Sequence, residues 1–181
     1  MRARYWLVAL VGTALSASLA GCSRPSSALS PLEVSFSSCV IVEGQSRELV
    51  FGFPANSGTS VSTYKLVSAE LLEPANVQLE ATYVQLPGVP IPSAQDVADF
   101  DATAPGISAL TGFEFESNAT TIYVLVDVTG TLGTSATGFG GVRLTYETPI
   151  GTQRQLDLSG EVVFDSACSP EDDADSATSV A

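Results

Sequence analysis

Carboxylates are the side chains best suited to chemistry in this sequence, because it has no histidine and a single lysine, Lys65. Glu114 and Glu116 flank Phe115, and on a β-strand two such side chains project from one face about 7 Å apart. That separation lies within the range of about 6.5–9.5 Å that inverting glycosidases use for their two carboxylates. Parallel carboxylates on one strand are also typical of a solvated face, so a carboxylate-dependent glycosidase is the remote alternative.

A second group of acids, Asp96, Asp99 and Asp101, offers the oxygen ligands that Ca²⁺ prefers. The EF-hand pattern fails, since neither the sixth-position Gly nor the twelfth-position Glu is present when counting from Asp96 or Asp99. Acids in the first turn of a short helix and solvated loop charges explain the same residues without a metal. We predict no metal site and keep these three aspartates as the calcium candidate.

The absence of histidine excludes most other catalytic machinery. It rules out a Ser-His-Asp triad, a Cys-His pair, the usual catalytic zinc sites and a cupredoxin copper site. The sequence therefore predicts no catalytic residues and a protein that is not an enzyme.

The first 22 residues indicate where the protein is located. Arg2 and Arg4 precede an apolar run, Trp6 to Leu19, that is shorter than the roughly 20 residues needed to span a membrane. The run ends in Leu19-Ala20-Gly21-Cys22, and this order resembles a bacterial lipoprotein signal peptide with its lipobox. The resemblance implies cleavage after Gly21 and an extracytoplasmic protein, lipid-anchored to the bacterial cell membrane through the Cys22 thiol. Other interpretations are an ordinary secretory signal with a chance cysteine and an uncleaved anchor helix.

If Cys22 carries lipid, two cysteines remain, Cys39 and Cys168. Export places them in an oxidising compartment, where pairing is the default. We therefore predict a Cys39–Cys168 disulfide that closes a loop of about 130 residues and stabilises the fold by roughly 4 to 5 kcal/mol on the chain-entropy estimate. The alternative of a redox or metal-binding thiol pair has no CxxC motif or histidine to support it. No cofactor is expected beyond the covalent lipid.

The mature chain is strongly acidic. Without the signal peptide it keeps five Lys and Arg against twenty Asp and Glu, a formal charge of −15, and has no Met, Trp or His. Such a charge argues against binding nucleic acid and against a second, electrostatic contact with anionic lipid. A cation or a basic partner remains compatible with it, although acidity alone commonly serves solubility.

Composition divides the chain into four parts: a signal peptide (1–21), a lipidated tether (22–31), a folded domain (32–170) and an acidic, disordered tail (171–181). Within the domain, apolar residues recur with period two, which predicts β-strands. Gly160 is expected to form a bulge or bend in the last strand. The predicted strands are 34–42, 48–53, 61–72, 77–83, 122–128, 142–147 and 156–164.

Two connections stand out. Pro87 to Thr111 is long, and Ser93 is predicted to cap a short helix there, with Val97 and Phe100 facing inward. It is interpreted either as a functional loop or as a crossover between two sheets. The glycine-rich stretch Gly130–Gly141 is expected to be a flexible hairpin tip.

These features predict an all-β fold, an immunoglobulin-like antiparallel β-sandwich of seven or eight strands with one long connection containing a short helix. It departs from true immunoglobulin domains because it has no core tryptophan and its cysteines lie at the ends of the domain. The leading hypothesis is a non-enzymatic module that binds an envelope protein, with Asp99, Phe100 and Phe139 as partner-binding candidates. The alternative is a small-molecule carrier or sensor.

Overall fold

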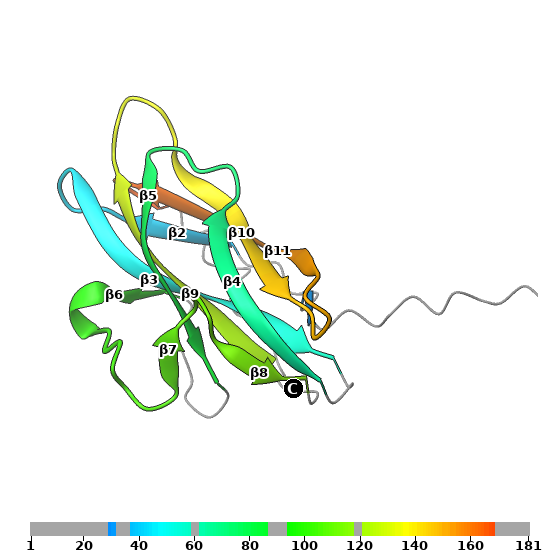
Figure 1. Cartoon of the computed structure of the whole chain (residues 1–181). Coiled ribbons are helices and arrows are strands. Elements are labelled where there is room, and N and C mark those ends of the chain that lie inside the picture. The colour runs from blue at the N-terminus through cyan, green and yellow to red at the C-terminus, as the bar shows by residue number, and fades with distance from the viewer. Residues whose placement is uncertain (1–28, 32–36, 59–61, 87–93, 118–120, 169–181) are drawn as a thin grey trace, which may run out of the picture.

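Two β-sheets pack face to face in the computed structural model (Figure 1). The structure describes residues 29–31, 37–58, 62–86, 94–117 and 121–168. The predicted all-β sandwich is confirmed, while the immunoglobulin-like detail stays a prediction. In the described part of the chain, no helix is long and apolar enough to cross a membrane.

The larger sheet has six strands in the order β1-β3-β9-β5-β7, and β6 pairs with the same edge of β3 as β1 does. All its pairings are antiparallel. Its strands are β1 (Leu29–Pro31), β3 (Ser46–Ser57), β5 (Val77–Gln85), β6 (Ala94–Asp96), β7 (Ile107–Ala109) and β9 (Thr121–Thr131).

The smaller sheet has five strands in the order β2-β11-β10-β4-β8. Its edge strand β2 runs parallel to β11, so the prediction of a wholly antiparallel sandwich is wrong at this edge. Its strands are β2 (Ser37–Ile41), β4 (Thr63–Leu71), β8 (Glu114–Glu116), β10 (Thr137–Glu147) and β11 (Gln153–Asp165).

Eleven strands are present among the described residues, where seven or eight were predicted. The additional ones are short: β1, β6, β7 and β8 have three residues each, too few for a period of two to show in the sequence. β1 also lies inside the predicted tether, with Leu29 only 1% exposed. The folded part therefore begins earlier than residue 32.

The core lies between the sheets and is built by the alternation that the sequence displays. On β9, Ile122, Val124, Val126 and Val128 all point into it. Phenylalanines fill its centre, where the ring of Phe51 meets those of Phe139 and Phe164 edge to face. Rings packed this way contribute beyond their buried area alone.

The glycine-rich stretch is mostly strand, not loop. β9 and β10 extend to Thr131 and from Thr137, leaving a turn of residues 132–136. A Cβ on Gly138 would collide with the carbonyl oxygen of Val162, and one on Gly130 with the ring of Phe164. The glycines allow close packing of β10 on β11 and of the sheets on each other, so the prediction of a flexible tip is wrong.

The prediction of Phe139 as a partner-binding residue is also wrong. It is 4% exposed and packs on Phe51 and Phe53 in the core, so its side chain is not available to a partner. The irregularity predicted at Gly160 is present, because the β10–β11 register shifts between the pairs Phe139–Val162 and Gly141–Ser159.

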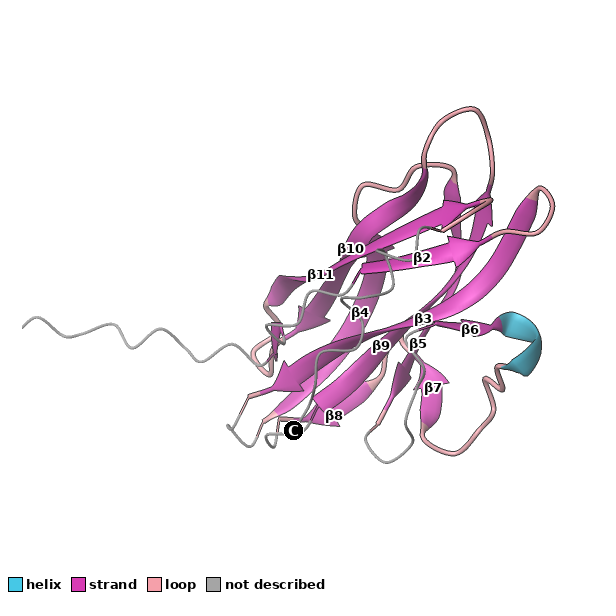
Figure 2. Cartoon of the chain, turned by 180° about the vertical axis from the view of Figure 1, so that it is seen from behind, coloured by secondary structure: helices cyan, strands magenta, loops and turns pink. Residues whose placement is uncertain are grey.

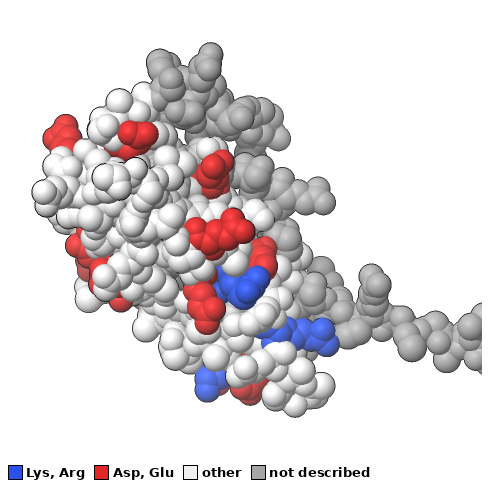
Figure 3. Space-filling view, turned by 90° about the horizontal axis from the view of Figure 1, so that it is seen from above, with Lys and Arg blue, Asp and Glu red and all other residues white. Residues whose placement is uncertain are grey.

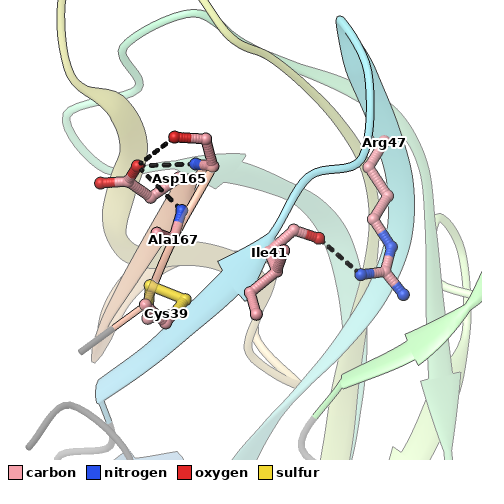
Figure 4. The surroundings of a disulfide bond; sticks show 7 residues. Cys39, Ile41, Arg47, Asp165 and Ala167 are labelled. Carbon is pink, nitrogen blue, oxygen red and sulfur yellow. Dashed lines mark hydrogen bonds between the residues drawn. A yellow bond between two sulfur atoms is a disulfide. The ribbon is translucent and has the colours of Figure 1, made fainter. Parts of the chain in front are cut away.

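The disulfide between Cys39 and Cys168 is confirmed, with Cα atoms 5.8 Å apart and a sequence separation of 129 residues (Figure 4). It ties the edge strand β2 to the segment that follows β11. The carboxylate of Asp165 shapes that segment, accepting hydrogen bonds from the backbone N–H groups of Ser166 and Ala167.

Candidate functional site

A flap, defined here as residues 94–106, lies on the outer face of the larger sheet. It starts with β6 beside β3, continues through a single 3-10 turn, η1 (Val97–Asp99), and leads to β7 beside β5. Because β9 separates β3 from β5, the flap crosses the sheet from one side to the other. Figure 2 shows it as a lobe on one side of the sandwich, with η1 in cyan.

The flap covers a small apolar patch on the outer face. Val50 and Leu125 point away from the core, yet they are only 1% and 0% exposed. The ring of Phe100 packs on that of Tyr83, with centroids 5.2 Å apart. The inward orientation predicted for Phe100 is confirmed, whereas Asp99 is exposed and Ser93 lies outside the described residues. The ring of Phe100 is thus packed against Tyr83 within the chain.

Asp127 lies at the border of this patch. It pairs with Val50 on β3 and with Ala81 on β5, so its side chain emerges on the outer face between these strands. The residue is 8% exposed, and its Oδ1 is buried without a hydrogen-bond partner. A buried carboxylate oxygen without a donor is unfavourable, which makes this atom unusual in the described structure.

Two further carboxylates surround Asp127 and define, with it, the acidic site: Glu48 on β3 and Glu80 on β5. Burial raises the pKa of Asp127 to about 6, and repulsion by Glu48 and Glu80 adds to the effect. A side-chain hydrogen bond with Glu48 also favours the protonated form. Near neutral pH the site therefore holds negative charge that its surroundings do not balance.

The lysine and arginine side chains of the described residues have other partners or lie on the smaller sheet, away from the acidic site. Arg47 forms an ion pair with Asp96 (2.9 Å) and donates to the carbonyl of Ile41 (2.7 Å; Figure 4). Arg143 forms a two-contact pair with Asp157 on the smaller sheet. Lys65 and Arg154 also belong to the smaller sheet, in β4 and β11. An ammonium or guanidinium group from outside the chain would therefore be the natural complement of the acidic site.

The calcium candidate does not assemble. Asp96 is held by Arg47, and the carboxylate of Asp101 accepts hydrogen bonds from the backbone and hydroxyl of Thr103. Within the part of the chain that the structure describes, no three acidic, cysteine or histidine side chains are grouped to hold a metal ion. Asp101 instead shapes the flap, and Asp96 attaches it to β3 through Arg47.

Glu114 and Glu116 lie on β8 as predicted, on either side of the buried Phe115. Both are exposed at the edge of the smaller sheet, opposite Lys65 and Thr63. This placement is that of a solvated face.

Hollows occur at more than one place on the surface of the described residues. One, of about 310 Å³, lies between the edge strand β2 and β3, and is lined by Ser38, Cys39, Val40, Ile41, Arg47, Leu49 and Asp96. Another, of about 230 Å³, is lined by Glu73, Ala75, residues 136–140, and residues 161–163. The larger volume is close to the lower end of small-molecule sites, about 300 Å³, and the smaller volume is below it.

Acidic side chains outnumber basic ones on the surface seen from above (Figure 3). Viewed from above, red Asp and Glu side chains occur at several places on the molecule, and blue Lys and Arg at fewer (Figure 3). Complementary charge of this kind accelerates the approach of a basic partner and selects against acidic ones.

Neither the family models nor the curated protein sequences compared with this chain show a match.

The acidic site was not predicted from the sequence, although one signal for it exists. Asp127 is the single charged residue in the run 121–131, where both faces of the strand are otherwise apolar or uncharged. Its neighbours Glu48 and Glu80 come from strands far away in the chain, so their convergence depends on sheet order.

Proposed function

We propose that this protein is a non-enzymatic, lipid-anchored module of the bacterial cell envelope that binds a basic segment of another envelope protein at the acidic site. The observation that carries the proposal is the buried Oδ1 of Asp127, which has no donor, beside Glu48 and Glu80. A lysine or arginine side chain of the partner pairs with the exposed carboxylates of Glu48 and Glu80 and supplies the positive charge that the buried Asp127 lacks.

The proposed location depends on the lipobox. Leu19-Ala20-Gly21-Cys22 implies lipid on Cys22, and β1 begins at Leu29, so only six residues separate the modified cysteine from the first strand. The experiment is radioactive palmitate labelling with a Cys22→Ser variant as control. Label on the parent chain that is absent from the variant, together with a larger and still labelled precursor that accumulates after globomycin treatment, supports the anchor. Equal labelling of both chains rejects it.

The binding mode predicts a pH dependence. The partner's cation interacts with ionised Asp127, and protonation removes that interaction. Since the pKa of Asp127 is about 6, affinity falls as the pH drops below that value. Salt weakens the contacts of the exposed Glu48 and Glu80 more than that of Asp127.

Site-specific photo-cross-linking in cells tests the binding face. The reactive residue replaces Gln78, an exposed residue beside the acidic site on β5, or Gln155, an exposed residue on the smaller sheet. We expect one discrete cross-linked protein from position 78 and none from position 155. In the combined Glu48→Gln, Glu80→Gln, Asp127→Asn background the product should disappear. A product that persists in this neutral background contradicts the proposed site.

A further inference from the structure

The chain enters the sandwich at one defined end. β1 pairs Leu29 with Ser57, at the end of β3, and β1 also contacts β11. The hydroxyl of Tyr146, the last core residue of β10, forms a hydrogen bond with the backbone of Leu29. The same end of the molecule therefore contains the start of β1 and the β10–β11 connection, residues 148–152 (Figure 1).

That connection presents an apolar residue to the outside. Ile150 is 87% exposed, the highest among the large hydrophobic residues exposed in the described chain. The backbone N–H of Gly151 donates to Thr148 (2.9 Å), and that of Thr148 donates to Thr152 (2.9 Å). Gly151 adopts a φ of +78°, which suits glycine. The turn thus holds Ile150 outward in a fixed position, without a packing partner in the described structure.

A second exposed apolar residue lies at this end. Leu86 is 40% exposed and follows Gln85, which pairs with Tyr123 near the start of β9. Ile41, the remaining large exposed hydrophobic residue, lies after Val40 at the opposite end, where β2 leads into the β2–β3 turn. Two of the three exposed residues of this kind thus lie at the end where the chain enters.

Charge is nearly balanced at this end, unlike in the chain as a whole. Lys65 and Arg154 lie here, two of the four cations in the described residues, and pair across strands with Glu147 and Tyr146. The carboxylates on the described strands at this end are Glu114, Glu116 and Glu147. A nearly neutral, partly apolar surface can approach a bilayer more closely than the acidic faces can.

The short segment between Cys22 and Leu29 limits how far the domain can lie from a lipid on Cys22. Cys22 and Leu29 are seven residues apart, which spans at most about 25 Å when fully extended. β3, with 12 residues, is about 40 Å long. An anchor on Cys22 therefore keeps the entry end near the bilayer, and the 132–136 turn lies beyond its reach at the other end.

We propose that the entry end, with Ile150 at the tip of the β10–β11 turn, contacts the lipid bilayer and orients the domain on it. This inference rests on the proposed lipid anchor at Cys22. The Ile150 side chain enters the interfacial region between headgroups and acyl chains, while Lys65 and Arg154 lie at headgroup level, as cationic side chains do at membrane interfaces. The contact acts in addition to the anchor and fixes which surfaces face away from the membrane.

The experiment uses the lipidated protein purified from a bacterial host and reconstituted into vesicles of phosphatidylcholine with a quarter of phosphatidylglycerol. An environment-sensitive fluorophore is attached at Thr152→Cys, next to Ile150, or at the control position Thr134→Cys in the opposite turn. We expect quenching by aqueous iodide to be several-fold weaker at 152 than at 134, and lipid-borne quenchers to act at 152 only.

The matched variant Ile150→Glu keeps the turn and removes the apolar contact. With this change, iodide quenching at 152 should rise to the level at 134, whereas Ile150→Leu should leave it low. Equal quenching at 152 and 134 in the parent protein overturns the inference. Vesicle flotation separates this result from failure of the anchor: protein that floats with the vesicles is anchored, and protein that stays unbound and unlabelled with palmitate rejects the anchor itself.

Discussion

Replacing Asp127 by asparagine should stabilise the protein at neutral pH. The substitution keeps the size of the side chain and its capacity to bond to Glu48, and removes a charge that is buried beside two other carboxylates. The raised pKa means that the folded protein holds the proton more tightly than the unfolded chain does. The stabilisation that the protonated Asp127 contributes to folding is complete below the unfolded pKa of 3.8. It is lost as the pH rises through about 6.

The magnitude follows from the shift. A pKa that rises from 3.8 to about 6 corresponds to at most about 3 kcal/mol, at about 1.4 kcal/mol per unit. About half of this loss occurs between pH 5 and pH 7.5. The Asp127→Asn variant does not lose this free energy of unfolding, because asparagine does not ionise. We therefore expect its stability advantage over the parent to grow by about 1.4 kcal/mol across that interval.

The measurement is urea denaturation of a Cys22→Ser form at several pH values, followed by circular dichroism or tyrosine fluorescence. Differences between variant and parent cancel the contributions of the other carboxylates. Asp157→Asn is the control: Arg143 holds the pKa of Asp157 below its usual value, so this variant should lose a little stability at neutral pH. A stability difference for Asp127→Asn that stays constant from pH 4 to pH 7.5 would refute the assigned environment of Asp127.

Three other tests concern the fold. Phe139→Ala should destabilise the protein by about 3–5 kcal/mol in urea denaturation, because it opens a cavity in the core; a change below 1 kcal/mol would instead place Phe139 at the surface. Gly138→Ala should shift the denaturation midpoint strongly, since its Cβ meets the Val162 carbonyl, and Gly133→Ala should not. Removing the disulfide with Cys39→Ala and Cys168→Ala should cost up to about 4–5 kcal/mol, and reducing agent should then have no further effect on the midpoint.

Alternation in the sequence predicted the long strands because each has one face in the core. In β9, the run 122–128 shows this directly, and its partly apolar second face indicates a central strand. The three-residue strands could not be predicted, because they form only where a neighbouring edge is available. The parallel pairing of β2 with β11 likewise depends on tertiary contact between segments more than 100 residues apart.

Residue type alone could not separate loop from strand in the glycine-rich stretch. Glycine is typical of turns, but in β10 it is required by close approach of another backbone, and Gly141 has a φ of +131°. The aspartates of the flap were predicted as a group from their spacing, yet Asp96 is drawn to Arg47, which is 49 residues away. The acidic site presents the reverse case, because its residues are far apart in the chain and come together only in the folded sheet.

The pairing of β2 with β11 affects how the chain can fold. β11 is the last described strand, and the covalent link to Cys39 also waits for Cys168. A chain that emerges from a ribosome therefore cannot complete the smaller sheet until β11 has been released. Most of the contacts that hold the sandwich are long-range, which is typical of slow folding. Late closure of this kind places formation of the Cys39–Cys168 disulfide among the final steps of folding.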